Sequence, residues 1–312
     1  MSVYPPYTAW LLFPLSAFNP LSAQFIFLAL IFAAFLTSCK IIAGLNTTFK
    51  NINFFPNCIF YLCFAPLFIS ILGSQNTALS CLLFLIFCFC LTKNSRLYDF
   101  LGGLSIGFWL FKPQFAVFFI ILIIAARIWY ALLGASVLGL SYYLLAAKDM
   151  GALWFIDWIN ALQKFSEQNF IANSHNMTSI SGTTKAFAYY LNDNASGTLH
   201  YTLSFLATTL AVSLAVFFLI RISKVKRVNL NFYFLKFAPV LVLISPQTLF
   251  YDIGIAFSAY LSAINFSDSK SYNRLFVLIL VSWILVMTRE YVSCPLLFLL
   301  PLYMAMTFPR KP

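Results

Sequence analysis

Five polar clusters interrupt an otherwise apolar chain, and their side chains could carry chemistry on a charged substrate. An ammonium group and amide donors can hold an anion such as a phosphate, while a carboxylate can accept a proton. An ionisable residue at membrane depth is itself a sign of function. The clusters therefore predict an anion-binding site. They are Tyr4-Pro5-Pro6-Tyr7, Gly73-Ser74-Gln75-Asn76, Lys112-Pro113-Gln114, Ser245-Pro246-Gln247-Thr248 with Tyr251-Asp252, and Arg289-Glu290.

Each cluster also has an interpretation without a function. Ser74 could cap a helix, and Lys112 could extend its charge to the lipid headgroups. The segment 245–248 could be a tight turn, and Arg289 with Glu290 could be a local turn pair. The two histidines fit ordinary loop positions: His175 and His200.

The composition defines the class of protein. Hydrophobic residues make up 62% of the 312 residues, charged residues make up 9%, and the mean hydropathy is +0.89. A soluble domain is about 25% charged, so most of this chain must lie in lipid or against other apolar helices. The net charge of +11 does not indicate a nucleic-acid partner, because the basic residues are scattered between apolar runs. The seven cysteines lack metal-ligand spacing with histidine, so we expect buried thiols, no disulfides, no metal and no other cofactor.

Apolar runs supply the elements that must position the clusters. A full span needs about 20 apolar residues. The runs 98–111 and 114–126 are shorter and meet at Lys112-Pro113, where the residue before the proline resists helical geometry. We predict an all-α polytopic membrane protein, formed by residues 1–312 as one domain, with about 10–11 transmembrane or half-membrane helices. The runs stand near 8–18, 21–44, 55–72, 77–92, 98–111, 114–126, 128–146, 201–221, 232–248, 250–266, 275–288 and 294–308.

The distribution of Lys and Arg predicts the orientation through the positive-inside rule. If Met1 is outside and each run from residue 21 onward crosses once, most basic residues fall inside. The C-terminus is then cytoplasmic, and all five polar clusters lie at the extracytoplasmic face of a cell (inner) membrane. Five basic residues are left outside: Lys112, Lys148, Lys164, Lys185 and Arg289.

The one long hydrophilic segment, 147–200, is predicted to be an extracytoplasmic loop. Within it, GALWFIDWINALQKF places apolar residues on one helical face, which is typical of a helix lying on the membrane surface. The residues from Ser174 to Gly197 are rich in Ser, Thr, Asn and Gly, so we expect a loop there. The apolar face of the surface helix consists of Trp154, Trp158, Leu162 and Phe165.

Four of these segments resemble glycosyltransferase family 87, the family of polyprenyl-phosphate-mannose-dependent mannosyltransferases. The similar segments are YPPYTAWLLFPLSAF, GSQNTALSCLLFL, GGLSIGFWLFKPQFAVFF and SPQTLFYDIGIAF. Together they span most of the chain in order. The resemblance implies the GT-C membrane fold and transfer of a sugar, with inversion, from a polyprenyl-phosphate donor on the extracytoplasmic side. It also implies that the catalytic base is an aspartate in an external loop preceding Tyr-Pro-Pro. No residue here matches that aspartate, so we expect the chain to lack an N-terminal helix and the first external loop.

The expected activity is that of a membrane hexosyl- or mannosyltransferase with an extracytoplasmic glycan or glycolipid acceptor. A sugar phosphoester already has a good leaving group, so the site needs a carboxylate and donors for the phosphate rather than a strong acid. We expect Lys112 to bind the phosphate and Asp252 to play a supporting role without being the main base. The other candidate substrate-binding residues are Tyr4, Gln75, Asn76, Gln114 and Tyr251.

Two other functions remain open at the level of the sequence. A transporter or flippase for a lipid-linked substrate would also use broken helices and an intramembrane charge. It is disfavoured because the chain shows no internal repeat and no paired ionisable residues within its spans. An inactive, truncated remnant is the other alternative.

Overall fold

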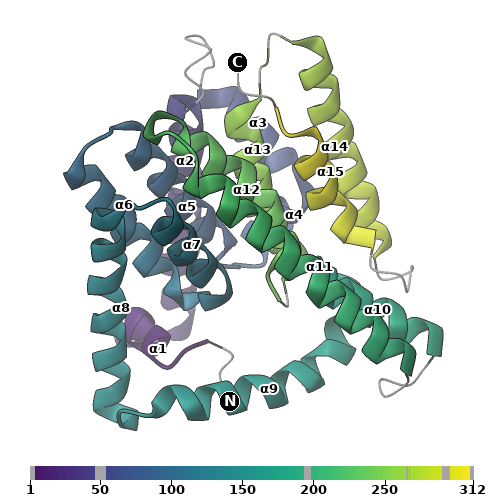
Figure 1. Cartoon of the computed structure of the whole chain (residues 1–312). Helices are drawn as coiled ribbons and strands as arrows, with labels where there is room; N and C mark the ends of the chain where they lie inside the picture. Colours follow the sequence, from purple (N-terminus) through teal and green to yellow (C-terminus); the bar gives the residue numbers. More distant parts are fainter. Residues whose placement is uncertain are drawn as a thin grey trace.

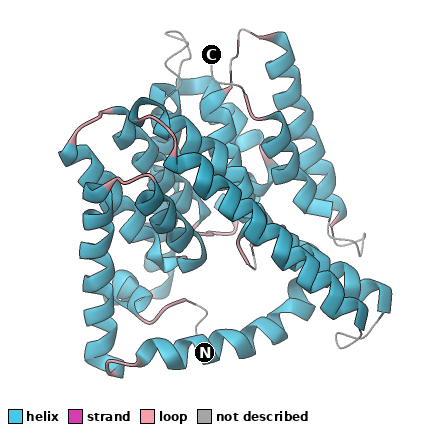
Figure 2. Cartoon of the chain, viewed as in Figure 1, coloured by secondary structure: helices cyan, strands magenta, loops and turns pink. Residues whose placement is uncertain are grey.

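The computed structural model of the chain is helical almost throughout (Figure 2). It describes residues 4–45, 54–192, 198–246, 248–264, 266, 268–289 and 296–309. Those ranges contain no named β-strand, and one isolated antiparallel bridge joins Met177 to Leu249. The predicted all-α class is therefore confirmed.

Five helices in the described ranges are long and apolar enough to cross a membrane. Three further apolar helices are shorter, with 10–17 residues. A 16-residue helix such as α5 reaches only about 24 Å, less than a hydrocarbon core of about 30 Å. The prediction of a polytopic membrane protein is confirmed. The long helices are α2 (Pro20–Leu45), α8 (Trp129–Met150), α11 (Thr198–Ser223), α12 (Leu230–Ile244, preceded by η4, Arg227–Asn229) and α14 (Ser269–Thr288). The short ones are α5 (Thr77–Thr92), α7 (Pro113–Ala125) and the pair η6 (Leu296–Phe298) and α15 (Leu299–Thr307).

The apolar run 55–72 is broken into two helices. α3 (Phe54–Cys63) and α4 (Ala65–Leu72) meet at an angle of 84°. Phe64 between them has extended backbone angles, and Pro66 stands in the first turn of α4, where its missing N–H costs nothing. The bend is followed by the short connection Gly73–Asn76, which leads from α4 into α5 and is exposed at Gly73 and half-buried from Ser74 to Asn76.

The predicted loop from Ser174 to Gly197 is wrong over most of its length. A short 3-10 turn, η3 (Ser174–Asn176), is followed by helix α10 (Ile180–Asn192). Ser179 starts this helix, because its Oγ accepts a hydrogen bond from the Gly182 N–H at 3.1 Å. The following stretch, KAFAYYLN, contains helix-forming and apolar residues. The prediction of a loop gave more weight to the Ser and Thr residues that precede it. Residues 193–197 lie outside the described ranges.

The predicted helix in the 147–200 segment is present as α9 (Trp154–Asn173). Figure 1 shows α9 lying across the end of the molecule opposite the C-terminus, between α8 and α10. Its first tryptophan was predicted to belong to the apolar face that lies on the membrane surface, but it packs inside the protein. Trp154 is buried against Tyr7 and Tyr142, because α1 (Tyr7–Leu12) folds back into the angle between α8 and α9. Among the α9 side chains whose burial the structure describes, the exposed large apolar ones are Phe155, Ile156 and Ile159.

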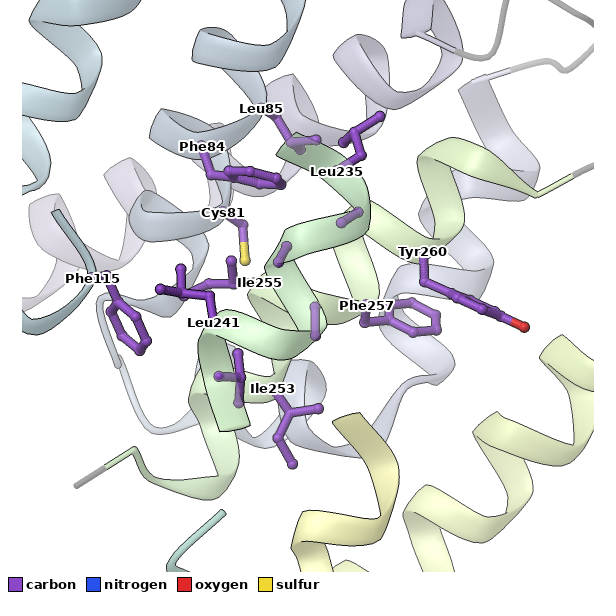
Figure 3. Close-up of a cluster of buried hydrophobic side chains, with 14 of the residues drawn as sticks. Cys81, Phe84, Leu85, Phe115, Leu235, Leu241, Ile253, Ile255, Phe257 and Tyr260 are labelled. Atoms are coloured by element: carbon purple, nitrogen blue, oxygen red, sulfur yellow. The ribbon is translucent and has the colours of Figure 1, made fainter. Parts of the chain in front are cut away.

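The core lies where α5, α12 and α13 (Ile253–Ala263) meet, as Figure 3 shows. Aromatic rings fill much of it. The Phe64 and Phe257 rings are stacked with their centroids 4.0 Å apart, which fixes the α3–α4 bend against α13. Gly254 allows this close packing, since a Cβ there would lie 2.4 Å from Leu67 Cδ2.

A second close contact joins α8 to α6 (Arg96–Phe108). A Cβ on Gly103 would lie 1.9 Å from the Ala131 carbonyl oxygen, and one on Gly134 would lie 2.2 Å from the Phe100 carbonyl oxygen. Small residues let membrane helices approach in this way. The contact fixes α6, whose C-terminal end leads through η2 (Trp109–Phe111) into the lysine discussed next.

Candidate active site

Lys112 occupies the break between two helices, as the sequence predicted. Its backbone angles, φ −121° and ψ 76°, end the η2 turn, and Pro113 opens α7. The Lys112 carbonyl accepts a hydrogen bond from the Phe115 N–H at 3.0 Å, which starts the new helix. Lys112 is only 4% exposed, so its charge is not extended into solvent.

The buried charge of Lys112 is matched by Asp252. Lys112 Nζ lies 2.6 Å from Asp252 Oδ1, and Asp252 is 3% exposed. Asp252 ends the 3-10 turn η5 (Phe250–Asp252) and precedes α13, and its Oδ2 accepts a hydrogen bond from the Leu249 N–H at 3.3 Å. Both carboxylate oxygens are therefore engaged. A pair buried this deeply is stable only with such additional hydrogen bonds.

An aromatic ring lies against the pair. Lys112 Nζ lies 5.3 Å from the centroid of the Tyr251 ring, within cation–π range. Tyr251 is in the connection between α12 and α13. Burial raises the pKa of its phenol, and the adjacent Asp252 carboxylate raises it further. The phenol is thus protonated at neutral pH and can donate a hydrogen bond.

The N-terminal tyrosine cluster meets the start of α5. Asn76 Nδ2 donates to the Tyr4 hydroxyl at 3.0 Å, although 72 residues separate them. Asn76 is the N-cap residue of α5, but its side chain makes no capping bond. Ser74, the alternative cap, has a φ of 52° and is not at the cap position. Gln75 Nε2 reaches the Gly73 carbonyl at 3.4 Å, a contact within its own turn.

Buried polar atoms without a hydrogen-bond partner occur just before and at the start of α5 and in the turn before Lys112. In the described part of the chain, three such atoms belong to the segment 70–77 and one belongs to η2. Thr77 lies against α13, since its methyl group is 3.0 Å from where a Cβ on Gly254 would stand. Unpaired buried polar atoms are costly unless something else occupies them. The four are Ser70 Oγ, Asn76 Oδ1, Thr77 Oγ1 and Trp109 Nε1.

The segment 245–252, called here the Ser-Pro element, follows α12 and contacts the segment Lys112-Pro113-Gln114. Ser245 Oγ donates to the Gln114 carbonyl at 3.4 Å, so Gln114 contacts the element through its backbone. The Thr178 N–H donates to the Thr248 carbonyl at 3.0 Å, which attaches the chain between α9 and α10 to the same loop. Gln247 lies outside the described residues.

A second cation contacts the turn that leads to Asp252. The Arg289 guanidinium lies 4.6 Å from the centroid of the Phe250 ring, and its Nη1 donates to the Val286 carbonyl at 2.9 Å. Phe250 is two residues from Asp252. The sequence suggested a turn pair of Arg289 with Glu290, but Glu290 lies outside the described residues. The Arg289–Phe250 contact was missed because nothing in the local sequence of either residue indicates it.

The two histidines lie in η3 and in α11. His175 lies in η3, with its Nε2 3.0 Å from Asn176 Nδ2. His200 was expected in a loop but lies in the first turn of α11. Among the described residues, no group of three or more His, Cys, Asp and Glu side chains is placed to hold a metal ion.

The fold and this site define a class: a polytopic helical membrane protein with a buried cation–carboxylate pair at one end of its bundle. The sequence profile of glycosyltransferase family 87 matches residues 3–246, and the chain belongs to that family. The match includes Tyr4, Asn76 and Lys112, and it ends just before Tyr251 and Asp252. No curated protein and no solved structure matches the chain.

Proposed function

We propose that this glycosyltransferase transfers a hexose, with mannose as the first candidate, from a polyprenyl-phosphate donor to an extracytoplasmic glycan or glycolipid. The observation that carries the proposal is the buried Lys112–Asp252 pair. We further propose that the bundle is a GT-C fold in a cell (inner) membrane.

The proposed roles of Lys112 and Asp252 follow from their charges. Breaking the bond from the sugar to the phosphate leaves negative charge on the phosphate, and preorganised cations stabilise it best where water is excluded. Lys112 has three N–H donors, and Asp252 takes one of them. The pair alone is neutral, so we assign the phosphate to the remaining N–H donors of Lys112.

Other groups around the pair complete the proposed phosphate site. The N-terminus of α5 carries a partial positive charge. The unpaired Thr77 hydroxyl and Trp109 N–H are available as donors. We assign Asp252 to hold Lys112 in place. Both of its oxygens are engaged, so the proton of the acceptor hydroxyl goes to another group.

The test is Lys112→Met, which keeps the bulk and removes the charge. Membranes carrying the variant should transfer mannose from a polyprenyl-phosphate donor at least about tenfold more slowly, equivalent to about 1.4 kcal/mol. Lys148→Met is the matched control, because Lys148 lies over the Trp10 ring away from the pair. Its transfer rate should not change.

The double variant Lys112→Met/Asp252→Asn separates this effect from misfolding. It leaves no uncompensated carboxylate, so it should fold while transfer stays low. Wild-type rates in Lys112→Met or in the double variant would contradict the proposed phosphate site.

We also propose that the site faces outward and the C-terminus faces the cytoplasm. Reporter fusions at Lys224 and at Asn194, which lies outside the described residues, should then report opposite sides of the membrane, with Lys224 cytoplasmic. The proposal rests on the basic-residue bias. Two fusions that report the same side would exclude this topology.

A further inference from the structure

A cavity of about 500 Å³ lies between the short helix α7 and the spanning helices α11 and α12, with α10 at one end. Its volume is within the range typical of ligand sites. α11 forms the outer wall and is the least enclosed of the spans, with only 11% of its apolar window buried. In a membrane, the cavity is therefore a groove that opens toward lipid.

The groove has a polar end and an apolar end. α11 and α12 run antiparallel along it, so Thr208 lies level with Ile244, and Leu219 lies level with Phe237. Ser181 and Lys185 of α10 join Thr208 at the first end. From Thr208 to Leu219 the groove extends about 16 Å. Its lining beyond the polar end is aliphatic and aromatic.

The polar end borders the candidate active site. Pro246 lines the groove there and belongs to the Ser-Pro element that ends at Asp252. Its neighbour Ser245 contacts Gln114, two residues after Lys112. A ligand whose apolar part filled the groove would thus present its polar end to the site.

A second cavity serves as a comparison, because its lining is that expected of a non-specific contact with lipid. It measures about 420 Å³ between α2 and α4. Phe25, Phe32 and Leu72 are among its lining residues, and every lining residue is apolar. It offers nothing to a charged headgroup, whereas the first groove places the Lys185 ammonium at one end.

We infer that the groove between α7, α11 and α12 binds the isoprenoid tail of the donor, with Lys185 at its polar end attracting the phosphate toward the neighbouring site at which Lys112 is proposed to bind it. The inference rests on the proposed function for the identity of the lipid. A single unbranched run of isoprene units fits a long, narrow groove that opens to lipid. The single cation at one end complements the single phosphate at the end of that tail.

The test uses a long-chain polyprenyl phosphate without a sugar, carrying a photoreactive diazirine on its first isoprene units. After irradiation in nanodiscs, adducts should map to α11 and α12. Val212→Trp should lower their yield about tenfold, because Val212 lines the groove. Leu210→Trp is the matched control: both residues are exposed on α11, at 56% and 51%, but Leu210 does not line the groove.

Further variants keep the inference falsifiable if Val212→Trp folds poorly. Val216→Trp blocks the groove one turn further along α11 and should act in the same way. Lys185→Met should lower the adduct yield, and Lys185→Arg should retain it. Equal labelling by a phosphatidylglycerol probe, uncompeted by polyprenyl phosphate, would overturn the inference in favour of a general lipid contact.

The outcome is distinguishable from a failure of the proposed function, because labelling requires no sugar transfer. If the wild-type protein transfers sugar but adducts do not map to the groove, the inference fails alone. If adducts map to the groove while transfer is absent, the proposed function fails and the lipid site stands. Equal labelling of Val212→Trp and Leu210→Trp would also overturn the inference.

Discussion

Two ion pairs join the same two parts of the chain at opposite ends, and they differ in almost every physical respect. Asp99 is in the first turn of α6 and Lys112 follows the end of that segment; Arg227 precedes α12 and Asp252 follows it. One pair is Arg227–Asp99, and the other is Lys112–Asp252. Both therefore fasten the α6 segment to the α12 segment.

Burial separates the two pairs. The side chains of Lys112 and Asp252 are 5% and 4% exposed, whereas those of Arg227 and Asp99 are 30% and 11% exposed. Arg227 also donates to Asn94 Oδ1 at 3.3 Å, an ordinary surface contact. A surface pair contributes about 0–1 kcal/mol. A buried pair often contributes no more than a packed apolar pair would, so stability alone gives no reason for charges at Lys112 and Asp252.

Removing one buried partner should therefore give the largest effect of all. Asp252→Ala leaves the Lys112 ammonium without its counter-charge, and such a change costs about 3–5 kcal/mol. Thermal unfolding in detergent should show a clear loss of stability against the wild-type protein. Sugar transfer should fall as well, because Lys112 loses the contact that orients it.

A double variant sharpens this result. Lys112→Met/Asp252→Leu removes both charges and should recover most of the stability lost in Asp252→Ala while sugar transfer stays low. That combination would assign the pair to function rather than to folding. A double variant as unstable as Asp252→Ala would mean that the pair is a structural element, and the contrast with the less buried pair would lose its basis.

Much of the fold could be predicted from the sequence, because lipid imposes simple rules. Long apolar runs must be helical in a membrane, and α2, α8 and α14 follow the predicted runs closely. The 84° bend between α3 and α4 was not predicted, since it depends on packing against α13 as well as on Pro66. Helix α10 was not predicted because its Ser and Thr residues suggested a loop. The sequence did not reveal that Ser179 caps the start of the helix.

The site was predictable only in part, for a similar reason. The break at Lys112 is local, because Pro113 restricts the residue before it. Its pairing with Asp252 joins residues 140 positions apart and depends on how α7 and α13 pack. The Arg289–Phe250 contact is equally remote in sequence. Periodicity and motif spacing carry no information about contacts of this kind.

The smallest effect should come from the less buried pair. Arg227→Met removes a charge that is 30% exposed and leaves Asp99, whose side chain is 11% exposed, without this partner. The expected loss of stability is smaller than that of Asp252→Ala, and it should shrink in high salt because the charge of the partly exposed Arg227 is screened. Sugar transfer should equal that of the wild-type protein, since Arg227 and Lys112 lie at opposite ends of α6 and the 13 residues of that helix alone extend about 20 Å. Unfolding curves at low and high salt, together with a transfer assay on the same membranes, check both expectations. A loss as large as that of Asp252→Ala would show that burial does not distinguish the two pairs, whereas normal stability with lost transfer would mean that the end of the bundle near Arg227 also takes part in the reaction.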